Sequence, residues 1–276
     1  MKYKAIISDI DGTLLNKDRE LSARTLQAIR GLGPEVPVVL ASSRMPKAMR
    51  HLQAELGILH CPLICYNGGY VIRPTESDGP DEVLHSAEIP LEACTAATVA
   101  AATTDVHVSL YHEDDWYVPQ IDYWSNREQN NTKVVPELTD YAALLERWAG
   151  AGIGPHKIMC MGPENEVQMI EDHLKAHFSE HLSLYRSKPT YLEIAHASIS
   201  KATALQVLLD RVYDFHMADF IGFGDNYNDM EMLEAVGLGV AVGNAKPEVL
   251  AIANEVTKTG KEDGVAQMIE QWMYPQ

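Results

Sequence analysis

The sequence is poor in basic residues and lacks any long apolar run. Lysine and arginine number 22 against 39 aspartate and glutamate residues, which gives a formal net charge of −17. So acidic a chain argues against general binding to DNA, RNA or anionic membranes. No stretch approaches the roughly 18–20 consecutive apolar residues that a membrane-spanning helix needs. The first residues, MKYKAIISDIDGT, lack the apolar core of a signal peptide, so we expect a cytoplasmic protein.

Cysteine is scarce as well. The chain has four cysteines, which are Cys61, Cys65, Cys94 and Cys160. In the segment CPLIC, three residues separate the first two, which is not the CxxC spacing of a redox or zinc motif. We therefore predict reduced and mostly buried thiols, as is usual in the cytoplasm.

Hydrophobic residues make up 46% of the 276 residues, enough for one large domain or two of ordinary size. Short apolar runs alternate with helical patterns near both ends of the chain, which predicts an α/β fold with a mostly parallel sheet. Strand and helix patterns are mixed in between, beyond a polar linker at 73–82. We predict a Rossmann-like core of residues 1–82 and 189–276, interrupted by an inserted α+β domain at 83–188.

Two carboxylates follow the first predicted strand, YKAIIS. Asp9 and Asp11 lie two positions apart in DIDGT, and alternate residues of an extended chain share a face. Like charges this close repel, so we expect a cation or a shared proton beside them. The carboxyl ends of strands are also where ligands bind in open α/β sheets. The alternative, an ordinary strand end with an Asp-Gly turn, is weakened by this context.

Two further segments have residue types that bind anions. Ser42, Ser43 and Arg44 follow the apolar run VPVVLA, and hydroxyl and backbone N–H groups at such a junction can hold phosphate. Lys201 opens a predicted helix, where a cation opposes the helix dipole unless it faces an anion. Taken alone, each segment fits an ordinary serine helix cap or a solvated lysine equally well.

A fourth segment, GFGDNYNDM, ends another apolar run and gathers acidic and amide side chains. Asp225 and Asp229 offer the hard oxygen ligands that Mg²⁺ prefers. Asn228 can donate an amide hydrogen bond to an anion. The alternative interpretation is an Asp- and Asn-rich loop that caps a helix.

These four segments, in this order and spacing, resemble the motifs of the haloacid dehalogenase-like (HAD) hydrolase superfamily. GDNYND, followed by VAVGNA at 240–245 and DGVA at 263–266, is similar to the Cof-type branch. The resemblance implies a HAD-like core with a type IIB α+β cap between the second and third motifs, where the mixed pattern lies. It also implies a Mg²⁺-dependent phosphatase of small phosphorylated metabolites, the activity of most members of that branch.

The resemblance implies a role for each matching residue. Asp9 would be the nucleophile that attacks phosphorus, and Asp11 the general acid to the leaving alcohol and then the base that activates water. Ser42 would bind the phosphate, and Lys201 would hold the transferred phosphoryl group. Ser43 stands where the family usually has glycine, which leaves the shape of the phosphate cradle open at this position.

The implied metal site holds Mg²⁺ between the Asp9 carboxylate, the backbone carbonyl of Asp11 and the Asp225 carboxylate. Asp229 would not bind the metal directly but would support the residues that do, and Asn228 would contact the phosphate. A carboxylate that attacks a phosphate dianion meets strong repulsion, which Mg²⁺ and Lys201 together would offset. An aspartyl-phosphate then splits one hard displacement into two easier ones.

Other functions stay open at this stage. One is a dedicated sucrose-phosphate or mannosyl-phosphoglycerate type of phosphatase, and another is a mutase that returns the phosphoryl group to its substrate. A third is a regulator that binds phosphorylated metabolites without catalysis, although the presence of every motif residue argues against it. Neither the substrate nor the oligomeric state follows from the sequence.

Two side-chain clusters allow two interpretations each. Aromatic residues gather at 111–124, where they could stack on a planar substrate or, as is more usual, pack a small sheet. His107 and His112 flank a predicted strand that acidic residues follow, so a metal site competes with a solvated loop, which we favour. Asn67, in the Tyr-Asn-Gly-Gly turn, is expected near the mouth of the pocket.

Overall fold

The computed structural model describes residues 2–75 and 79–274. The chain forms two compact units. The eight-stranded unit contains the chain up to Arg44, Met49–His85 and the chain from Ser200 onward, and the six-stranded unit contains Met45–Ala48 and Ser86–Ile199. Part of the predicted linker, residues 76–78, lies outside the described residues. None of the described helices combines the length and apolar character that crossing a bilayer requires.

The eight-stranded unit is built on one sheet with the strand order β14-β13-β12-β1-β2-β3-β4-β5. β1 pairs in parallel with both β12 and β2, and the β3–β4 pair is antiparallel. The strands are β1 (Ala5–Ser8), β2 (Val38–Ala41), β3 (Leu63–Cys65), β4 (Tyr70–Arg73), β5 (Glu82–Ser86), β12 (Phe220–Gly224), β13 (Leu238–Ala241) and β14 (Glu255–Val256). The central strands are buried on both faces, which explains their continuous apolar runs.

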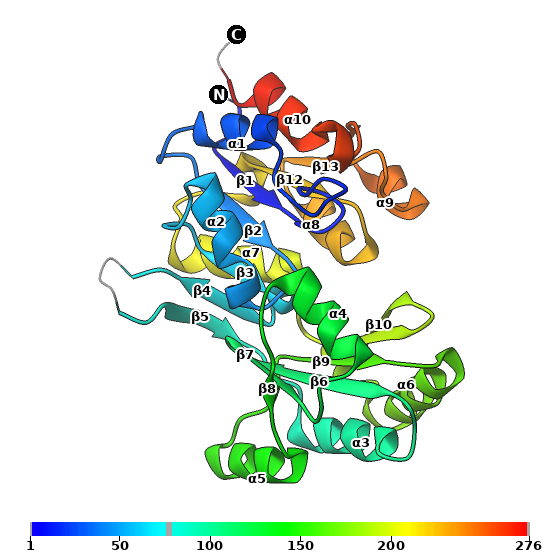
Figure 1. Ribbon diagram of the computed structural model, residues 1–276. Helices are drawn as coiled ribbons and strands as arrows, with labels where there is room; N and C mark the ends of the chain where they lie inside the picture. Colours follow the sequence, from blue (N-terminus) through cyan, green and yellow to red (C-terminus); the bar gives the residue numbers. More distant parts are fainter. Residues whose placement is uncertain (1, 76–78, 275–276) are drawn as a thin grey trace. The chain divides into compact units, whose positions relative to one another are not determined.

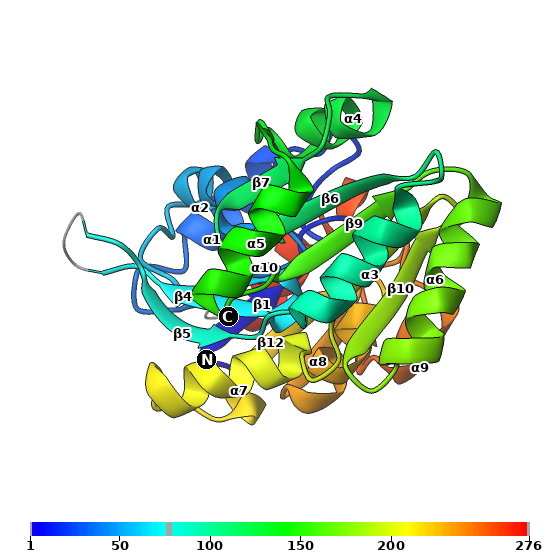
Figure 2. The same cartoon turned by 90° about the horizontal axis from the view of Figure 1, so that it is seen from below.

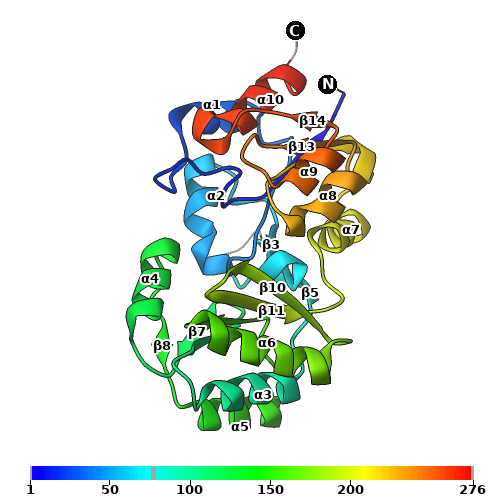
Figure 3. The same cartoon turned by 90° about the vertical axis from the view of Figure 1, so that its right-hand side faces the viewer.

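Helices pack on both faces of this sheet (Figures 1 and 3). α1 contacts α2 and α10, whereas α8 contacts α7 and α9. Ile7 and Val39 belong to the apolar cluster that α7, α8 and α9 cover. The helices are α1 (Ala23–Arg30), α2 (Arg50–Leu56), α7 (Lys201–Arg211), α8 (Met230–Ala235), α9 (Pro247–Ile252) and α10 (Gly264–Trp272), with 3₁₀ turns at Tyr66–Gly68, Met217–Asp219, Tyr227–Asp229 and Gly260–Glu262. The expected Ser22 cap is present, since its side chain accepts a hydrogen bond from the Thr25 N–H.

The six-stranded unit has the strand order β10-β11-β9-β6-β7-β8 and is antiparallel except for the β7–β8 pair. The strands are β6 (His107–His112), β7 (Asp115–Val118), β8 (Glu137–Leu138), β9 (Lys157–Met161), β10 (Leu182–Lys188) and β11 (Tyr191–His196). The helices are α3 (Leu91–Ala101), α4 (Tyr123–Thr132), α5 (Tyr141–Ala151) and α6 (Glu164–Phe178), and a 3₁₀ turn lies at Pro46–Ala48. Figure 2 shows α3, α5 and α6 on one face of the sheet.

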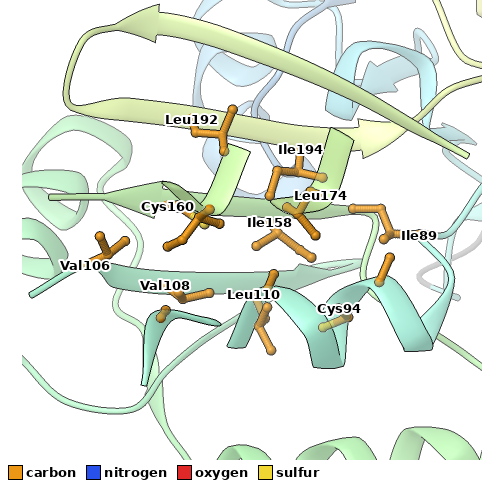
Figure 4. Packing of buried hydrophobic residues seen from close by; sticks show 14 of the residues in the cluster. Ile89, Cys94, Val106, Val108, Leu110, Ile158, Cys160, Leu174, Leu192 and Ile194 are labelled. Atoms are coloured by element: carbon orange, nitrogen blue, oxygen red, sulfur yellow. The ribbon is translucent and has the colours of Figure 1, made fainter. Parts of the chain in front are cut away.

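One apolar core fills the space between this sheet and its helices (Figure 4). Alternate residues of each strand point into it, such as Val108 and Leu110 of β6 and Ile158 and Cys160 of β9. Cys94 of α3 packs there as well. All four cysteines are buried and have free thiols, as the composition predicted.

The fold class is confirmed as mixed α/β with a mostly parallel sheet and an additional α+β unit. Two strands, β5 and β11, belong to a different sheet from the one predicted for them. The segment at 83–89 was placed in the insertion, but β5 is the edge strand of the eight-stranded sheet. The strand after residue 190 was placed in the core, but β11 forms a hairpin with β10 and pairs with β9. The predicted boundaries at 82/83 and 188/189 therefore differ from those observed, 85/86 and 199/200.

Most of the aromatic residues of the 111–124 segment have the packing role. Tyr111 and Trp116 are buried, and their rings stack with centroids 5.7 Å apart. Tyr117 packs edge-on against Trp148 in the apolar core. Tyr123, the first residue of α4, is 66% exposed, although its ring lies edge-on against Trp124.

Candidate active site

Adjacent parallel strands bring the first and fourth motifs together. Asp9 follows β1 and Asp225 follows β12, and these two strands pair along their full length. The Asp9 N–H donates to the carbonyl of Phe223, which continues the sheet by one residue. Because parallel strands end at the same edge of a sheet, both aspartates begin loops at that edge.

Lys201 joins these loops through a buried ion network. Its Nζ donates to Asp9 Oδ1 and to Asp229 Oδ1, each at 2.6 Å. The side chains of Lys201 and Asp229 are both 0% exposed. Lys201 is the first residue of α7, whose Ser200 cap accepts from the Thr203 N–H. The sequence alternatives for Lys201 are thereby resolved: this cation opens the helix because it faces two carboxylates rather than solvent.

Asp229 shapes the loop after β12. Its Oδ2 accepts hydrogen bonds from the backbone N–H groups of Asp225 and Asn226, at 2.9 and 3.0 Å. Its Oδ1 is bonded to Lys201, so each oxygen has partners within the protein. Gly224 leaves room for the Asp229 side chain, since a Cβ at position 224 would lie 2.4 Å from the Asp229 Cβ.

Three carboxylates converge with more negative charge than Lys201 neutralises. Asp9, Asp225 and Asp229 each offer an oxygen within 4.8 Å of the others. Asp9 Oδ2 is buried and has no hydrogen-bond partner among the described residues. Burial raises the pKa of Asp9 to about 8, against the opposing charge of Lys201 and with the help of Asp229 and Asp225. Carboxylates with unsatisfied oxygens and mutual repulsion are the donor set of a hard divalent cation.

Gly12 allows the first loop to pass close to Asp225. Its φ is +91°, and a Cβ at this position would lie 2.4 Å from Asp225 Oδ2. The Gly12 carbonyl accepts from Asn244 Nδ2 at 2.8 Å. Burial, together with Asp229, raises the pKa of Asp225 to about 6 although Lys201 acts against it. A side chain at position 12 would displace this carboxylate.

The carboxylate of Asp11 has a different environment. Arg44 donates to it through Nε and Nη2, at 2.7 Å to Oδ2 and 2.8 Å to Oδ1. Arg19 Nη2 also donates to Oδ1, at 2.6 Å. Burial raises the pKa of Asp11, but the hydrogen bonds and charges of the two arginines outweigh it, and the net pKa is lowered. Asp11 is therefore held as a carboxylate.

The second motif forms the next loop at the same sheet edge. Ser42 is buried after β2, with its N–H bonded to the Ile64 carbonyl and its own carbonyl accepting from the Asn67 N–H. Asn228 Nδ2 donates to Asn67 Oδ1 at 3.0 Å. Ser43 does not have a positive φ, unlike six non-glycine residues of the described chain, so its backbone does not require the glycine usual in the family.

Comparison with known protein families shows to which family the chain belongs. The family model of the haloacid dehalogenase-like hydrolases matches residues 6–269. The chain belongs to this family. The match contains all four motifs, so the family predicted from the sequence is confirmed.

Individual haloacid dehalogenase-like relatives agree. A Haemophilus influenzae protein with a provisional phosphatase name is 34% identical over 274 residues, 98% of each chain. The 5-amino-6-(5-phospho-D-ribitylamino)uracil phosphatase of Bacillus subtilis is 28% identical over 97% of this chain and 96% of its own. The HMP-PP phosphatase of Serratia proteamaculans is 26% identical over 98% and 96%. The prediction of an enzyme of phosphatase type is confirmed by these matches.

Solved structures give the same result for the fold. A haloacid dehalogenase-like hydrolase from Bacteroides thetaiotaomicron has a TM-score of 0.87 and 29% identity, covering 98% of this chain and 99% of its own. A HAD subclass IIB sugar phosphatase, 21% identical, has a TM-score of 0.78 over 98% of both chains and supports the fold alone. Both structures therefore agree with the observed fold of this chain.

The structure of this hydrolase brings Asp9, Lys201, Asp225 and Asp229 together, as the motifs predicted. The two arginines that bind Asp11 were not predicted from the sequence. Arg44 was noted only as part of the second motif, although its place beside a predicted anion site was a usable signal. Arg19 lies in a polar loop and has no such signal.

A second group of metal-binding residue types occurs in the six-stranded unit of this hydrolase. Glu88, His112 and His156 each have a potential ligand atom within 4.8 Å of the others. His156 Nδ1 accepts from the Glu113 N–H, so Nε2 carries the proton and donates to Ser86 Oγ at 2.9 Å. Both ring nitrogens of His156 thus bind protein groups, so this group forms a polar network within the protein.

Proposed function

We propose that this chain is a Mg²⁺-dependent phosphomonoester hydrolase that acts on small phosphorylated metabolites through an aspartyl-phosphate. The observation that carries the proposal is the environment of Asp9. One oxygen of its carboxylate is fixed by Lys201, while the other is buried and has no partner among the described residues. An oriented carboxylate with one oxygen unengaged suits in-line attack on phosphorus.

Asp9 and Asp225 are the side chains that would hold the metal, together with the Asp11 carbonyl that the family implies. The fit rests on the three converging oxygens and on the burial and mutual repulsion that raise the pKa of both Asp9 and Asp225. When bound, magnesium supplies positive charge that lets a carboxylate approach a phosphate dianion. Asp229 supports the site indirectly, because Lys201 and two backbone N–H groups already bind its oxygens.

The proposed reaction has two displacements at phosphorus. Asp9 forms a bond to phosphorus while the ester P–O bond breaks, and Asp11, once it has taken up a proton from solvent, gives that proton to the departing alkoxide. Water then attacks the aspartyl-phosphate, Asp11 accepts its proton, and the Asp9 carboxylate and inorganic phosphate are released. The carboxylate form of Asp11 that the arginines favour is the one that serves the second displacement.

The remaining motif residues would bind the phosphoryl oxygens. Lys201 places a positive charge beside Asp9, where negative charge builds up during transfer. Ser42 and Ser43 would contribute hydroxyl and backbone N–H groups from the loop after β2. Asn228, held by Asn67, can turn an amide N–H towards the same anion.

The names of the relatives support a small phosphorylated metabolite as the substrate, since they include an HMP-PP phosphatase and a phosphoribitylamino-uracil phosphatase. We further propose that the six-stranded unit selects the substrate, as the type IIB resemblance implies. Tyr123, exposed on α4, is a candidate for that role. Tyr123→Ala is expected to change the order of the substrates ranked by kcat/KM. Met169→Ala, at an exposed position on α6, is expected to leave that order unchanged. The same order in both variants would contradict this assignment.

The decisive experiment measures phosphate release from a panel of sugar phosphates, pyridoxal phosphate, flavin mononucleotide and nucleotides. Release is expected to need Mg²⁺, to stop with EDTA, and to fall by about 10⁴-fold or more in Asp9→Asn, which lacks the nucleophile. Asp210→Asn, an exposed acid on α7, is the matched control. Release that persists in Asp9→Asn would refute the proposal, and a phosphorylated isomer among the products would indicate a mutase.

A further inference from the structure

Two arginines share one carboxylate oxygen at the edge of the site. Arg19 Nη2 lies 2.6 Å and Arg44 Nη2 lies 2.8 Å from Asp11 Oδ1, so these two nitrogens are within about 5.4 Å of each other. Two positive charges at such a separation repel, and the anion between them offsets that repulsion. Asp11 provides one negative charge for two guanidinium groups.

Arg19 is not needed to satisfy Asp11. Arg44 is buried and already donates to both oxygens of the carboxylate in the fork geometry of an arginine–carboxylate pair. Arg19 adds one further bond, and Asp11 is its one acidic partner among residues 2–75 and 79–274. The Arg19 side chain is 47% exposed. This second cation is therefore available to an anion from solvent at the cost of one exposed ion pair, which is small.

The loop that carries Arg19 is fixed rather than loose. Asn16 Oδ1 accepts hydrogen bonds from the backbone N–H groups of Asp18 and Glu20. The Arg19 N–H donates to the Asn16 carbonyl, and Arg19 has a φ of +62°. A positive φ is unfavourable for a side chain of this kind, so the surrounding bonds must hold the backbone in this conformation. The loop thus presents the guanidinium group at a defined place.

We propose that Arg19 and Arg44 form a binding subsite for a second anionic group, carried by the leaving part of the substrate. The inference rests on the proposed function, in which Asp11 protonates the leaving oxygen. That oxygen would lie within a hydrogen bond of Asp11, hence within about 5.5 Å of the Arg19 guanidinium. A carboxylate or phosphate a few bonds beyond the leaving oxygen can reach this distance. Preferred substrates then carry two separated negative groups.

The experiment compares matched pairs of substrates. Phosphoglycolate and 2-hydroxyethyl phosphate differ only in a carboxylate against a hydroxymethyl group, and methyl diphosphate and methyl phosphate differ in a second phosphate. Wild-type protein is expected to have at least a tenfold higher kcat/KM for the anionic member of one or both pairs. The pair that shows the preference identifies the anion as carboxylate, phosphate or either.

Variants at Arg19 assign the preference. Arg19→Gln is expected to reduce the anionic-to-neutral ratio at least fivefold, chiefly through KM, and Arg19→Lys should keep most of it because the charge stays. Arg24→Gln, which removes an exposed arginine paired with Glu270, should leave the ratio unchanged. Higher salt should lower the wild-type ratio, since exposed charges are screened.

The outcomes separate this inference from the proposed function. Equal kcat/KM within both pairs, or an equal loss for both members of each pair in Arg19→Gln, would overturn the subsite while phosphate release itself continued. No release from any of the four compounds, or release that survives Asp9→Asn, would count against the proposed function instead.

Discussion

The inner and outer parts of the proposed active site differ in how far their charged side chains are buried. In the inner part, Lys201 and Asp229 are fully buried and every contact is internal to the protein. In the outer part, the side chains of Arg19 and Asp11 are 47% and 38% exposed. A buried ion network cannot open without a large penalty, whereas an exposed pair opens easily. The inner part is therefore suited to holding its side chains in one arrangement. In the outer part, Arg19 can leave Asp11 and bind a substrate anion instead.

The most severe test of this comparison is Lys201→Met. It leaves the buried carboxylates of Asp9 and Asp229 without their cation, and removing one member of a buried ion pair costs about 3–5 kcal/mol. We expect a large fall in the free energy of unfolding and a loss of kcat of at least about 10²-fold. Chemical denaturation and phosphate release measure the two effects.

Arg19→Met is the matched change in the outer part. It is expected to shift the free energy of unfolding by less than about 1 kcal/mol, because it removes only an exposed ion pair. Equal destabilisation by the two substitutions would contradict the distinction between the inner and outer parts.

A substitution at Gly12 tests how closely the loops approach in the inner part. Gly12→Ala places a Cβ 2.4 Å from Asp225 Oδ2 at a φ of +91°. The strain is expected to cost about 1–3 kcal/mol of stability and to lower the affinity for Mg²⁺. Gly150→Ala is the control, because a Cβ there meets nothing within 4 Å and the helix α5 should gain up to about 1 kcal/mol. Thermal unfolding measures the stability of both variants, and a Mg²⁺ titration of activity measures their affinity for the metal.

The pH dependence of stability tests the crowding of carboxylates. The pKa values of Asp9 and Asp225 are raised to about 8 and about 6, so the folded protein binds more protons than the unfolded chain above about pH 4. Their contribution to stability is present below that pH and is lost as the pH rises through 6 and 8. Mg²⁺ should restore it, so the rise in Tm on adding Mg²⁺ should be larger at pH 8 than at pH 5.5. An equal rise at both pH values would argue against these carboxylates as the metal site.

Asp225→Asn is expected to have the smallest effect on stability and the most specific effect on metal binding. Removing one carboxylate relieves repulsion, so the metal-free variant should be more stable than the metal-free wild type at pH 8, by about 1 kcal/mol or a few degrees in Tm. Its Tm should no longer respond to Mg²⁺, and its activity should be lost. Asp219→Asn, which removes a carboxylate paired with Lys4 away from the site, should keep the Mg²⁺ response.

The inner part could be predicted from the sequence because local patterns determine it. A buried apolar strand followed at once by an acid places that acid at the sheet edge, which is why Asp9 and Asp225 were found. Lys201 and Asp229 each also fit an ordinary solvated lysine or a helix-capping loop when taken alone. They were predicted because all four segments together have the order and spacing of the family's motifs.

Asp11 was predicted from the sequence, but its contacts with the two arginines of the outer part were not, because no local pattern connects these residues. Arg19 lies in a polar loop without periodicity, and its contact with Asp11 depends on how that loop folds back. Sheet membership is a non-local property as well, so β5 and β11 were placed in the other sheet. The helix α4 was missed because its sequence, YWSNREQNNT, is polar almost throughout and has no apolar stripe.

The insertion of one unit into the other has a consequence for biosynthesis. Asp9 is made early, but Lys201 follows 192 residues later, and β1 finds β12 only after the entire six-stranded sheet has been translated. In a nascent chain, the six-stranded unit can therefore fold before β1 and β12 of the eight-stranded unit pair. The proposed catalytic centre is therefore complete only near the end of synthesis. A chain that stops before α7 would contain the whole six-stranded unit but would lack Lys201, Asp225 and Asp229.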